Sequence, residues 1–269
     1  MRIYKTDLDA VFFAGDLHGE FDGIVSTINS YNLRDCNIVV CGDIGFGFEK
    51  EGYYHQTFHK ISKTLKKRNV HCYLIRGNHD DKAYFDGEHF EEYDYIHVLP
   101  DYSVIQTPSR NILAVGGATS IDRTMRIQHM EYLAADYARW HNCSLEEGRK
   151  NCRQCYWPTE AVVYDAEEID KLDELGIKID TVCTHTAPSN CEPFTKYGLE
   201  GWLDYDPDLD VDLAAERATC DMIRERLLAK GHHITHWYYG HFHSQHTDVI
   251  DGIMYKMLDM FRGTLDLSM

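Results

Sequence analysis

Five short apolar runs in this chain each end in a polar turn that carries aspartate, asparagine or histidine. The runs are rich in β-branched and aromatic residues, which is typical of buried strands. The turns that follow them are Gly15-Asp16-Leu17-His18-Gly19, Gly42-Asp43, Arg76-Gly77-Asn78-His79-Asp80, Thr184-His185 and Gly240-His241-Phe242-His243. Because each turn presents metal-seeking side chains at a strand end, the chain is limited to folds that gather strand ends in one place.

The segments between the first three runs have the spacing of helices. Apolar residues recur at intervals of three and four from Phe21 to Ile28 and again from Tyr54 to Leu65. The order is therefore a strand at 11–14, a helix, a strand at 37–41, a helix and a strand at 70–75. Such alternation predicts an α/β fold with parallel strands.

Parallel strands joined by right-handed crossovers point the same way, so their carboxyl ends share one edge of the sheet. Ligands of α/β proteins bind at that edge. We therefore expect Asp16, His18, Asp43, Asn78 and His79 to meet in space.

The rest of the chain continues this pattern less regularly. Further strands are expected at 111–115, 180–184, 234–239 and 249–258, and helices at 159–176 and 211–230. Residues 122–158 lack clean periodicity and are rich in Arg, Tyr, Trp and Cys, which indicates an insertion that carries substrate contacts or a lid. Since no Gly/Ser-rich or Pro-rich linker interrupts the chain, we expect residues 1–269 to form a single domain.

The chain is strongly acidic, with a net charge of −17. This charge disfavours stable binding to nucleic acid or to an anionic membrane, because both need a positive surface. An anionic substrate would need a local reversal of the field, which bound cations supply. The chain begins without an apolar signal core and contains no run approaching the roughly 18 apolar residues of a membrane span, so a cytoplasmic location is the default expectation.

The nine cysteines are odd in number and scattered, which favours free thiols over a disulfide framework. An alternative for part of this set is a structural zinc site formed by His141, Cys143, Cys152 and Cys155. A single CxxC pair is a weak signal, so loop thiols are the simpler interpretation.

The motifs supply carboxylate, imidazole and amide ligands without thiolate. From such a set we expect manganese, with iron, zinc, nickel or magnesium as alternatives. The candidate ligands are Asp16, His18, Asp43, Asn78, His185, His241 and His243. Seven ligands are too many for one tetrahedral ion but suffice for two divalent or trivalent ions that share a carboxylate.

The ordered set DxH, GD, GNHD, TH and GHFH resembles the calcineurin-like metallophosphoesterase superfamily, from Asp16 to His243. The resemblance implies a β-sandwich of two mixed sheets flanked by helices, in α-β-β-α layers. It also implies that one ion takes Asp16, His18 and His243, that the other takes Asn78, His185 and His241, and that Asp43 bridges them. By the same resemblance His79 is the general acid, and Asp80 orients and charges its imidazole.

One branch of that superfamily fits less well. Protein serine/threonine phosphatases continue from the bridging aspartate with Val-Asp-Arg-Gly, whereas Asp43 here leads into Ile-Gly-Phe-Gly-Phe. The stretch Gly-Gly-Ala-Thr-Ser-Ile-Asp-Arg that ends at Arg123 is similar to one found in compact bacterial and phage members. Arg123 or Arg126 is therefore a candidate for bidentate phosphate binding, beside Asn78.

These observations predict a hydrolase of phosphate esters, either a phosphatase or a phosphodiesterase, in which metal-bound hydroxide attacks phosphorus in line. The expected substrate is a small phosphorylated molecule, with nucleotides among the candidates. Two alternatives are a non-catalytic protein-binding module that keeps the fold and a protein serine/threonine phosphatase. Every ligand position and His79 are present, which favours an enzyme. The natural substrate, the preference for mono- or diesters and the oligomeric state stay open.

Overall fold

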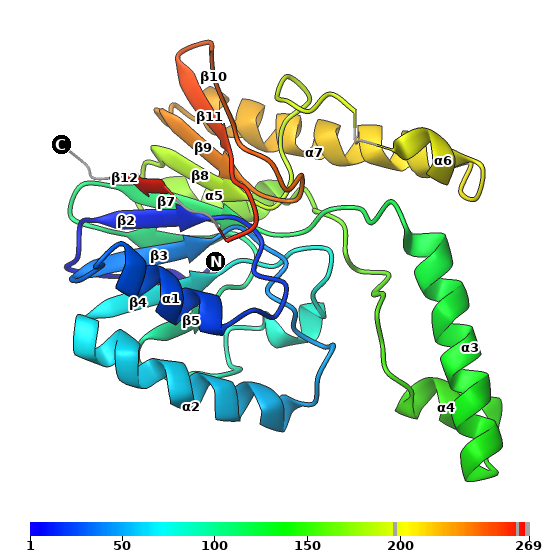
Figure 1. The fold of residues 1–269 in the computed structure, drawn as a ribbon. Coiled ribbons are helices and arrows are strands. Elements are labelled where there is room, and N and C mark those ends of the chain that lie inside the picture. The colour runs from blue at the N-terminus through cyan, green and yellow to red at the C-terminus, as the bar shows by residue number, and fades with distance from the viewer. Residues whose placement is uncertain (196–197, 262–263, 267–269) are drawn as a thin grey trace.

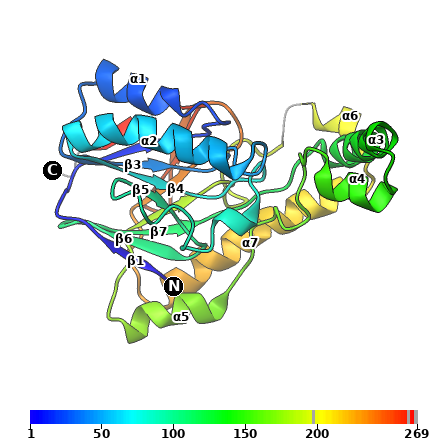
Figure 2. The same ribbon diagram turned by 90° about the horizontal axis from the view of Figure 1, so that it is seen from below.

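Two β-sheets face each other at the centre of the molecule, and helices cover both outer faces (Figures 1 and 2). The computed structural model describes residues 1–195, 198–261 and 264–266. The layers follow the order α-β-β-α, and both sheets are mixed. The fold expected from the motifs is thereby confirmed.

The five-stranded sheet contains the three strands that open the chain's α/β pattern. Its strand order is β12 (Thr264–Asp266), β2 (Val11–Ala14), β3 (Cys36–Val40), β4 (Val70–Leu74) and β5 (Ile96–Val98). Strands β2 to β5 are parallel, and β12 adds an antiparallel edge next to β2. The parallel half predicted from helical and strand periodicity is confirmed.

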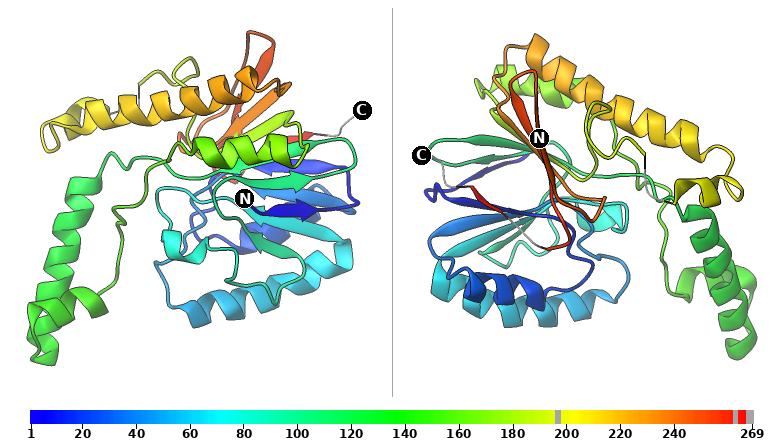
Figure 3. Two further views of the ribbon diagram at one scale, coloured as in Figure 1. Left: turned by 180° about the vertical axis from the view of Figure 1, so that it is seen from behind. Right: turned by 45° about the horizontal axis from the view of Figure 1, so that its top comes forward.

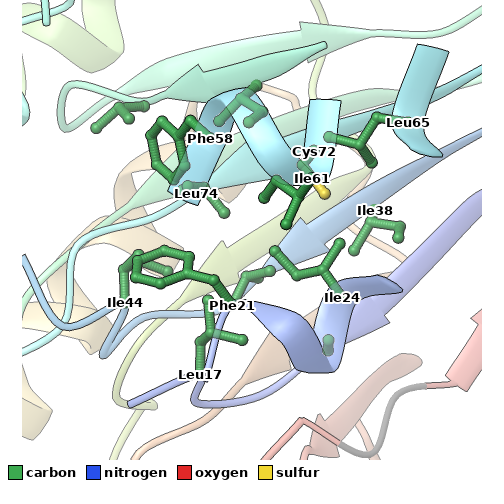
Figure 4. Close-up of a cluster of buried hydrophobic side chains, with 14 of the residues drawn as sticks. Leu17, Phe21, Ile24, Ile38, Ile44, Phe58, Ile61, Leu65, Cys72 and Leu74 are labelled. Carbon is green, nitrogen blue, oxygen red and sulfur yellow. The ribbon is translucent and has the colours of Figure 1, made fainter. Parts of the chain in front are cut away.

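Helices α1 (Asp22–Ser30) and α2 (Glu51–Arg68) cover the outer face of this sheet. Figure 4 shows their apolar side chains meeting those of the strands. The buried positions of α2 are Tyr54, Phe58, Ile61 and Leu65, as the spacing predicted. The helix ends at Arg68, and the left-handed backbone of the next residue, Asn69 (φ 52°), caps its last turn.

The seven-stranded sheet is built from later segments of the chain. Its order is β1 (Ile3–Lys5), β6 (Ser103–Gln106), β7 (Asn111–Val115), β8 (Thr181–Thr184), β9 (His236–Tyr239), β11 (Ile253–Met257) and β10 (His246–Ile250). Strands β7, β8, β9 and β11 are parallel. Strand β6 runs antiparallel to β7 and parallel to β1, and β10 runs antiparallel to β11. Helices α5 (Ala166–Glu174) and α7 (Leu209–Ala229) cover its outer face.

Side chains alternate across each central strand, so that every strand contributes to two apolar layers. In β2, Phe12 and Ala14 face the helices, whereas Val11 and Phe13 face the opposite sheet. Phe13 stacks on Tyr238 of β9 with ring centroids 3.8 Å apart, which joins the two sheets at the centre of the sandwich. Because both faces of these strands are buried, they appear in the sequence as continuous apolar runs.

Residues 122–158 form an arm that projects from the body (Figures 1 and 3). The arm consists of α3 (Arg123–His141) and α4 (Leu145–Asn151). The two helices pack closely because Gly148 lies against Ala134, where an added Cβ would overlap the Ala134 backbone. A capping box on Ser144 starts α4. We will call this segment the α3–α4 arm.

Two short helices complete the described structure. They are the 3₁₀ helix η1 (Lys82–Tyr84) and α6 (Leu199–Leu203). Helix η1 follows the GNHD turn, and α6 precedes α7.

Candidate metal centre

The motif residues of both sheets converge at the carboxyl ends of their strands. The five-stranded sheet supplies Asp16 and His18 after β2, Asp43 after β3, and Asn78 and His79 after β4. The seven-stranded sheet supplies His185 after β8, and His241 and His243 after β9. The site therefore lies across the junction of the two sheets.

The first ligand group consists of Asp16, His18 and His243. Together with Asp43, these residues offer ligand atoms that all lie within 4.8 Å of one another. The Nε2 atoms of His18 and His243 face each other at 3.0 Å, and His243 Nε2 lies 2.9 Å from Asp16 Oδ2. Asp16 Oδ2 is buried and accepts no hydrogen bond of good geometry. A buried carboxylate oxygen that faces two imidazole nitrogens is the arrangement a cation requires, so these residues fit a metal ion.

The second ligand group consists of Asn78, His185 and His241. His185 Nε2 lies 2.9 Å from Asn78 Oδ1, and the ring of His241 is 4.9 Å from that of His185. His185 Nδ1 donates to the Cys41 carbonyl oxygen at 2.7 Å. This bond fixes the orientation of the imidazole and leaves Nε2 free to act as a ligand.

Asp43 lies between the two groups. Its Oδ1 is 3.2 Å from His185 Nε2, and its Oδ2 is 3.9 Å from His18 Nε2. Burial alone would raise the pKa of Asp43, but the surrounding histidines, His185 first, lower it well below the usual range. Burial likewise opposes charge on His185, yet Asp43 and Asp16 raise its pKa to about 10. The buried carboxylates of Asp16 and Asp43 thus favour a positive charge between them. Either a metal ion or a proton on His185 can supply that charge.

Three glycines allow this convergence, because ligand residues from other strands lie directly against their backbones. A Cβ added to Gly42 would lie 2.9 Å from the His185 Cβ, and one added to Gly77 would lie 2.8 Å from the Asp43 Cα. A Cβ on Gly240 would overlap the Asp16 carboxylate. Only Gly42 of the three also needs a positive φ, of 104°.

His79 lies at the edge of the ligand groups. Its Nε2 is 3.8 Å from Asp43 Oδ2, and its ring is 5.7 Å from that of His18. Burial lowers the pKa of His79 to about 4, with Asp43 opposing and Arg126 adding to the decrease. Burial therefore favours the neutral form of this imidazole, which lines the cleft.

Asp80 is fully buried, and its role in orienting the His79 imidazole stays a prediction. Its carboxylate accepts hydrogen bonds from the backbone N–H groups of Ile44, Gly45, Phe46 and Gly77 at 2.7–3.0 Å. The described structure contains no hydrogen bond between Asp80 and His79. Asp80 thus joins the loop after β3 to the turn after β4, and any influence on the His79 ring passes through these loops.

A cleft of about 620 Å³ opens over the ligand groups. Asn78, His79 and Arg126 are among the residues that line it. Arg126 is held by Asp122 (Nε to Oδ1, 2.7 Å) and by the Cys155 carbonyl oxygen, at 3.1 Å. It can therefore face a bound anion without a change of backbone.

Arg123 is placed elsewhere. Its guanidinium forms ion pairs with Asp206 and Asp212 at 2.5 and 2.6 Å, and it does not belong to the cleft lining. These two pairs anchor the start of α3 to the segment around α7. The role of Arg123 as a phosphate ligand stays a prediction.

The proposed zinc ligands do not come together. The thiols of Cys152 and Cys155 each point at a backbone carbonyl oxygen of α3, those of Met130 and Arg126. Within the described ranges, the one group of three or more His, Cys, Asp or Glu ligands close enough to share an ion is that around Asp16. The simpler interpretation of these cysteines as free thiols therefore holds.

Sequence reasoning missed several buried polar residues around the site. Arg76 is fully buried and donates to the carbonyl oxygens of Gly116, Glu160 and Ala161. It thereby connects the base of the α3–α4 arm to the GNHD turn. Arg76 stands next to the motif, so its position was visible, but no pattern indicated its partners.

The layered fold and the donor groups at its strand ends define a metal-binding α/β protein. The chain belongs to the calcineurin-like phosphoesterase family, whose model matches residues 10–245. The resemblance to this superfamily that the motifs indicated is thereby confirmed. The cluster of candidate metal ligands at the strand ends agrees with this membership.

Known proteins resemble the chain at low identity. UDP-2,3-diacylglucosamine hydrolase from Blochmanniella floridana is 26% identical over 120 residues, which cover 41% of this chain and 47% of that protein. The chain thus spans about half the length of this curated relative. One solved crystal structure, 13% identical, covers 96% of this chain and 98% of its own with a TM-score of 0.51. Phosphopantetheinyl hydrolase from Mycobacterium tuberculosis is 14% identical over 95% of this chain and 91% of its own, with a TM-score of 0.43.

No helix of the described residues is both long and apolar enough to span a membrane.

Proposed function

We propose that this chain hydrolyses a small phosphate ester with two metal ions, one in each ligand group, and that Asp43 bridges them. The position of Asp43 between the groups carries this proposal, because its two oxygens face opposite sides. The donors are nitrogen and oxygen atoms only, which suits manganese, our preferred ion, and also iron, zinc, nickel or magnesium. When bound, such an ion pair supplies an activated water and neutralises charge on the phosphate.

The residues around the ions would divide the remaining work. His79 lines the cleft and would give a proton to the leaving oxygen. A phosphate beside it opposes the effect of burial on its pKa and favours the protonated imidazole. Arg126 would hold the phosphate oxygens by its planar guanidinium. Arg123 is a second candidate, which would need to exchange Asp206 for the phosphate.

The experiment that tests this function combines metal analysis with hydrolysis. We expect purified protein supplied with Mn²⁺ to hold two ions per chain and to hydrolyse bis-p-nitrophenyl phosphate or p-nitrophenyl phosphate. Asp43→Asn should lose both properties, whereas Asp22→Asn, which removes an exposed carboxylate paired with Lys60, should keep them. Full activity of the Asp43→Asn protein would refute the mechanism. Metal binding without any hydrolysis would instead favour a non-catalytic module.

A neighbouring cavity suggests what else the substrate carries. It has a volume of about 240 Å³ and shares Pro193, Thr195, His241 and Phe242 with the main cleft. Its other lining residues are the apolar Phe194, Leu199, Leu213 and Ala214 and the charged Asp210, Glu216 and Arg217. We propose that an apolar group of the substrate, attached to the phosphate, enters this cavity. The name of the Blochmanniella relative states that its substrate is diacylated, which is compatible with such a group.

Two substitutions on α7 test the cavity. Leu213 lines it, whereas Val211 on the same helix is 65% exposed and does not. For p-nitrophenyl phosphodiesters with methyl, butyl and hexyl groups, we expect KM to fall as the alkyl group lengthens, because apolar surface is buried. Leu213→Gln should weaken this trend and Val211→Gln should leave it intact. A KM that does not change with alkyl length would exclude the proposed apolar substituent.

A further inference from the structure

A chain of buried hydrogen bonds leads from the candidate ligand Asn78 away from the metal centre. Asn78 Nδ2 donates to Ser120 Oγ at 2.8 Å. Ser120 Oγ donates in turn to Glu160 Oε2 at 2.6 Å, and the Ser120 backbone N–H donates to Glu160 Oε1 at 2.9 Å. All three residues are buried, with exposures of 2%, 2% and 3%.

The carboxylate at the end of this chain is firmly placed. The Glu160 backbone carbonyl oxygen accepts from Arg76 at 2.8 Å and from the Ala118 N–H at 3.1 Å. Burial of a carboxylate is costly unless hydrogen bonds compensate for the lost water, and both Glu160 oxygens are bonded to Ser120. Glu160 is thus a buried acid kept at an energetic cost, and only Ser120 separates it from the candidate ligand Asn78 in the hydrogen-bond chain. Such a residue needs an explanation.

The direction of these bonds determines which end of the Asn78 amide faces the site. In its ionised form the Glu160 carboxylate only accepts, so Ser120 Oγ donates to it and is left to accept from the Asn78 NH₂ group. The opposite end of the amide, Oδ1, then points at His185 Nε2, 2.9 Å away. A flipped amide would present N–H donors to the ion and could not act as a ligand.

We propose that Ser120 and Glu160 are positioning residues that fix the Asn78 amide with its oxygen toward the second ion. The inference rests on the two-ion function proposed above. Ser120 also lines the cleft, but this role concerns the ligand rather than the substrate. Hydrogen-bonded partners of metal ligands commonly contribute 10–100-fold to metal affinity.

The test is a titration of metal-free protein with Mn²⁺, followed by calorimetry, with folding checked by circular dichroism. In Ser120→Ala we expect one of the two ions to bind about 10–100-fold more weakly and the other to change by less than about twofold. Glu160→Gln should weaken the same ion. The matched control is Ser103→Ala, because Ser103 is also buried and donates to a carbonyl oxygen, that of Pro100, outside the site. This control should bind both ions normally.

A second background separates orientation from general damage. Asn78→Asp replaces the two-sided amide by a carboxylate whose oxygens are equivalent, so there is no longer an orientation to fix. Adding Ser120→Ala to this variant should therefore cost less than about twofold in affinity, as a double-mutant cycle would measure.

The outcomes distinguish the inference from the function on which it rests. If wild type binds two ions and Ser120→Ala binds both equally well, the positioning role is wrong and the two-ion function stands. An equal loss in Ser120→Ala and Ser103→Ala, or an undiminished loss in the Asn78→Asp background, would also overturn the positioning role. If wild type itself binds fewer than two ions, both proposals fail.

Discussion

Replacing Gly77 by alanine tests whether close backbone packing creates the metal centre. The added Cβ would lie 2.8 Å from the Asp43 Cα and closer still to the Asp43 amide nitrogen and Oδ1. Ordinary contacts begin at 3.4 Å, so Asp43 must move by at least about 0.6 Å. Metal sites tolerate deviations of about 0.2 Å in ligand distance. The displacement is therefore at least about three times what the candidate bridging ligand can absorb.

We expect the Gly77→Ala protein to remain folded, with a loss of about 1–3 kcal/mol from overpacking. Its bound metal should fall below two ions per chain, and kcat/KM for the phosphodiester should decrease about 10²-fold, because a ligand misplaced by a fraction of an ångström disrupts the reacting geometry. Elemental analysis, thermal unfolding and steady-state kinetics measure these quantities.

The control is Gly52→Ala in α2, where an added Cβ meets nothing within 4 Å. Alanine in a helix is favoured over glycine by up to about 1 kcal/mol, so this protein should be active and slightly more stable. Wild-type metal content and turnover in Gly77→Ala would show that the turn can adapt, and the packing argument would be wrong.

Three further substitutions have distinct expected results. His79→Ala should lower kcat by about 10²–10⁴-fold with two ions still bound, because it removes a proton donor and no ligand; loss of metal would contradict its assignment. Arg126→Ala should raise KM for the phosphate ester and leave metal content unchanged, and an unaltered KM would exclude it as a phosphate contact. Burial raises the pKa of Glu160 from 4.5 to about 7, so folding takes up a proton between these values and stability falls as pH rises through them. In metal-free protein, the unfolding temperature should thus fall more steeply between pH 4.5 and pH 7 for wild type than for Glu160→Gln. Equal slopes of unfolding temperature against pH would refute this.

The parallel half of the fold could be predicted because its signals are local. Apolar spacing over a few residues defines α1, α2 and the strands between them, and the buried positions of α2 match that spacing. The second sheet could not be derived in this way, since it combines distant segments and its outer strand β10 has little buried surface. Only the family resemblance supplied it.

The α3–α4 arm had no readable period for a physical reason. Helix α3 packs on α4 rather than on a sheet, so it buries one residue, Ala134, and exposes large side chains such as Tyr132 and Trp140. A helix of this kind has no continuous apolar stripe. Its boundaries were nevertheless present in the sequence, as the left-handed Asn142 and the capping residue Ser144.

The candidate metal ligands could be named from the sequence because each follows a strand in a recognisable turn. Ser120 and Glu160 were not, since a serine and a glutamate 40 positions apart acquire meaning only through their contacts. For Asp80 the motif predicts the residue but not its contacts. The motif identified the residue, but its partners are backbone amides of another loop, which no motif describes.

The junction of the two sheets gives metal uptake a mechanical consequence. Some candidate ligands follow strands of the five-stranded sheet and the others follow strands of the seven-stranded sheet. Ions bound there would therefore cross-link the two halves of the sandwich, which otherwise hold together through apolar contact. Their binding free energy would then add to the resistance of the whole sandwich against unfolding. A chelator should lower the unfolding temperature of both halves together, although the ions touch only their rims, and differential scanning calorimetry would record this as a shift of one cooperative transition.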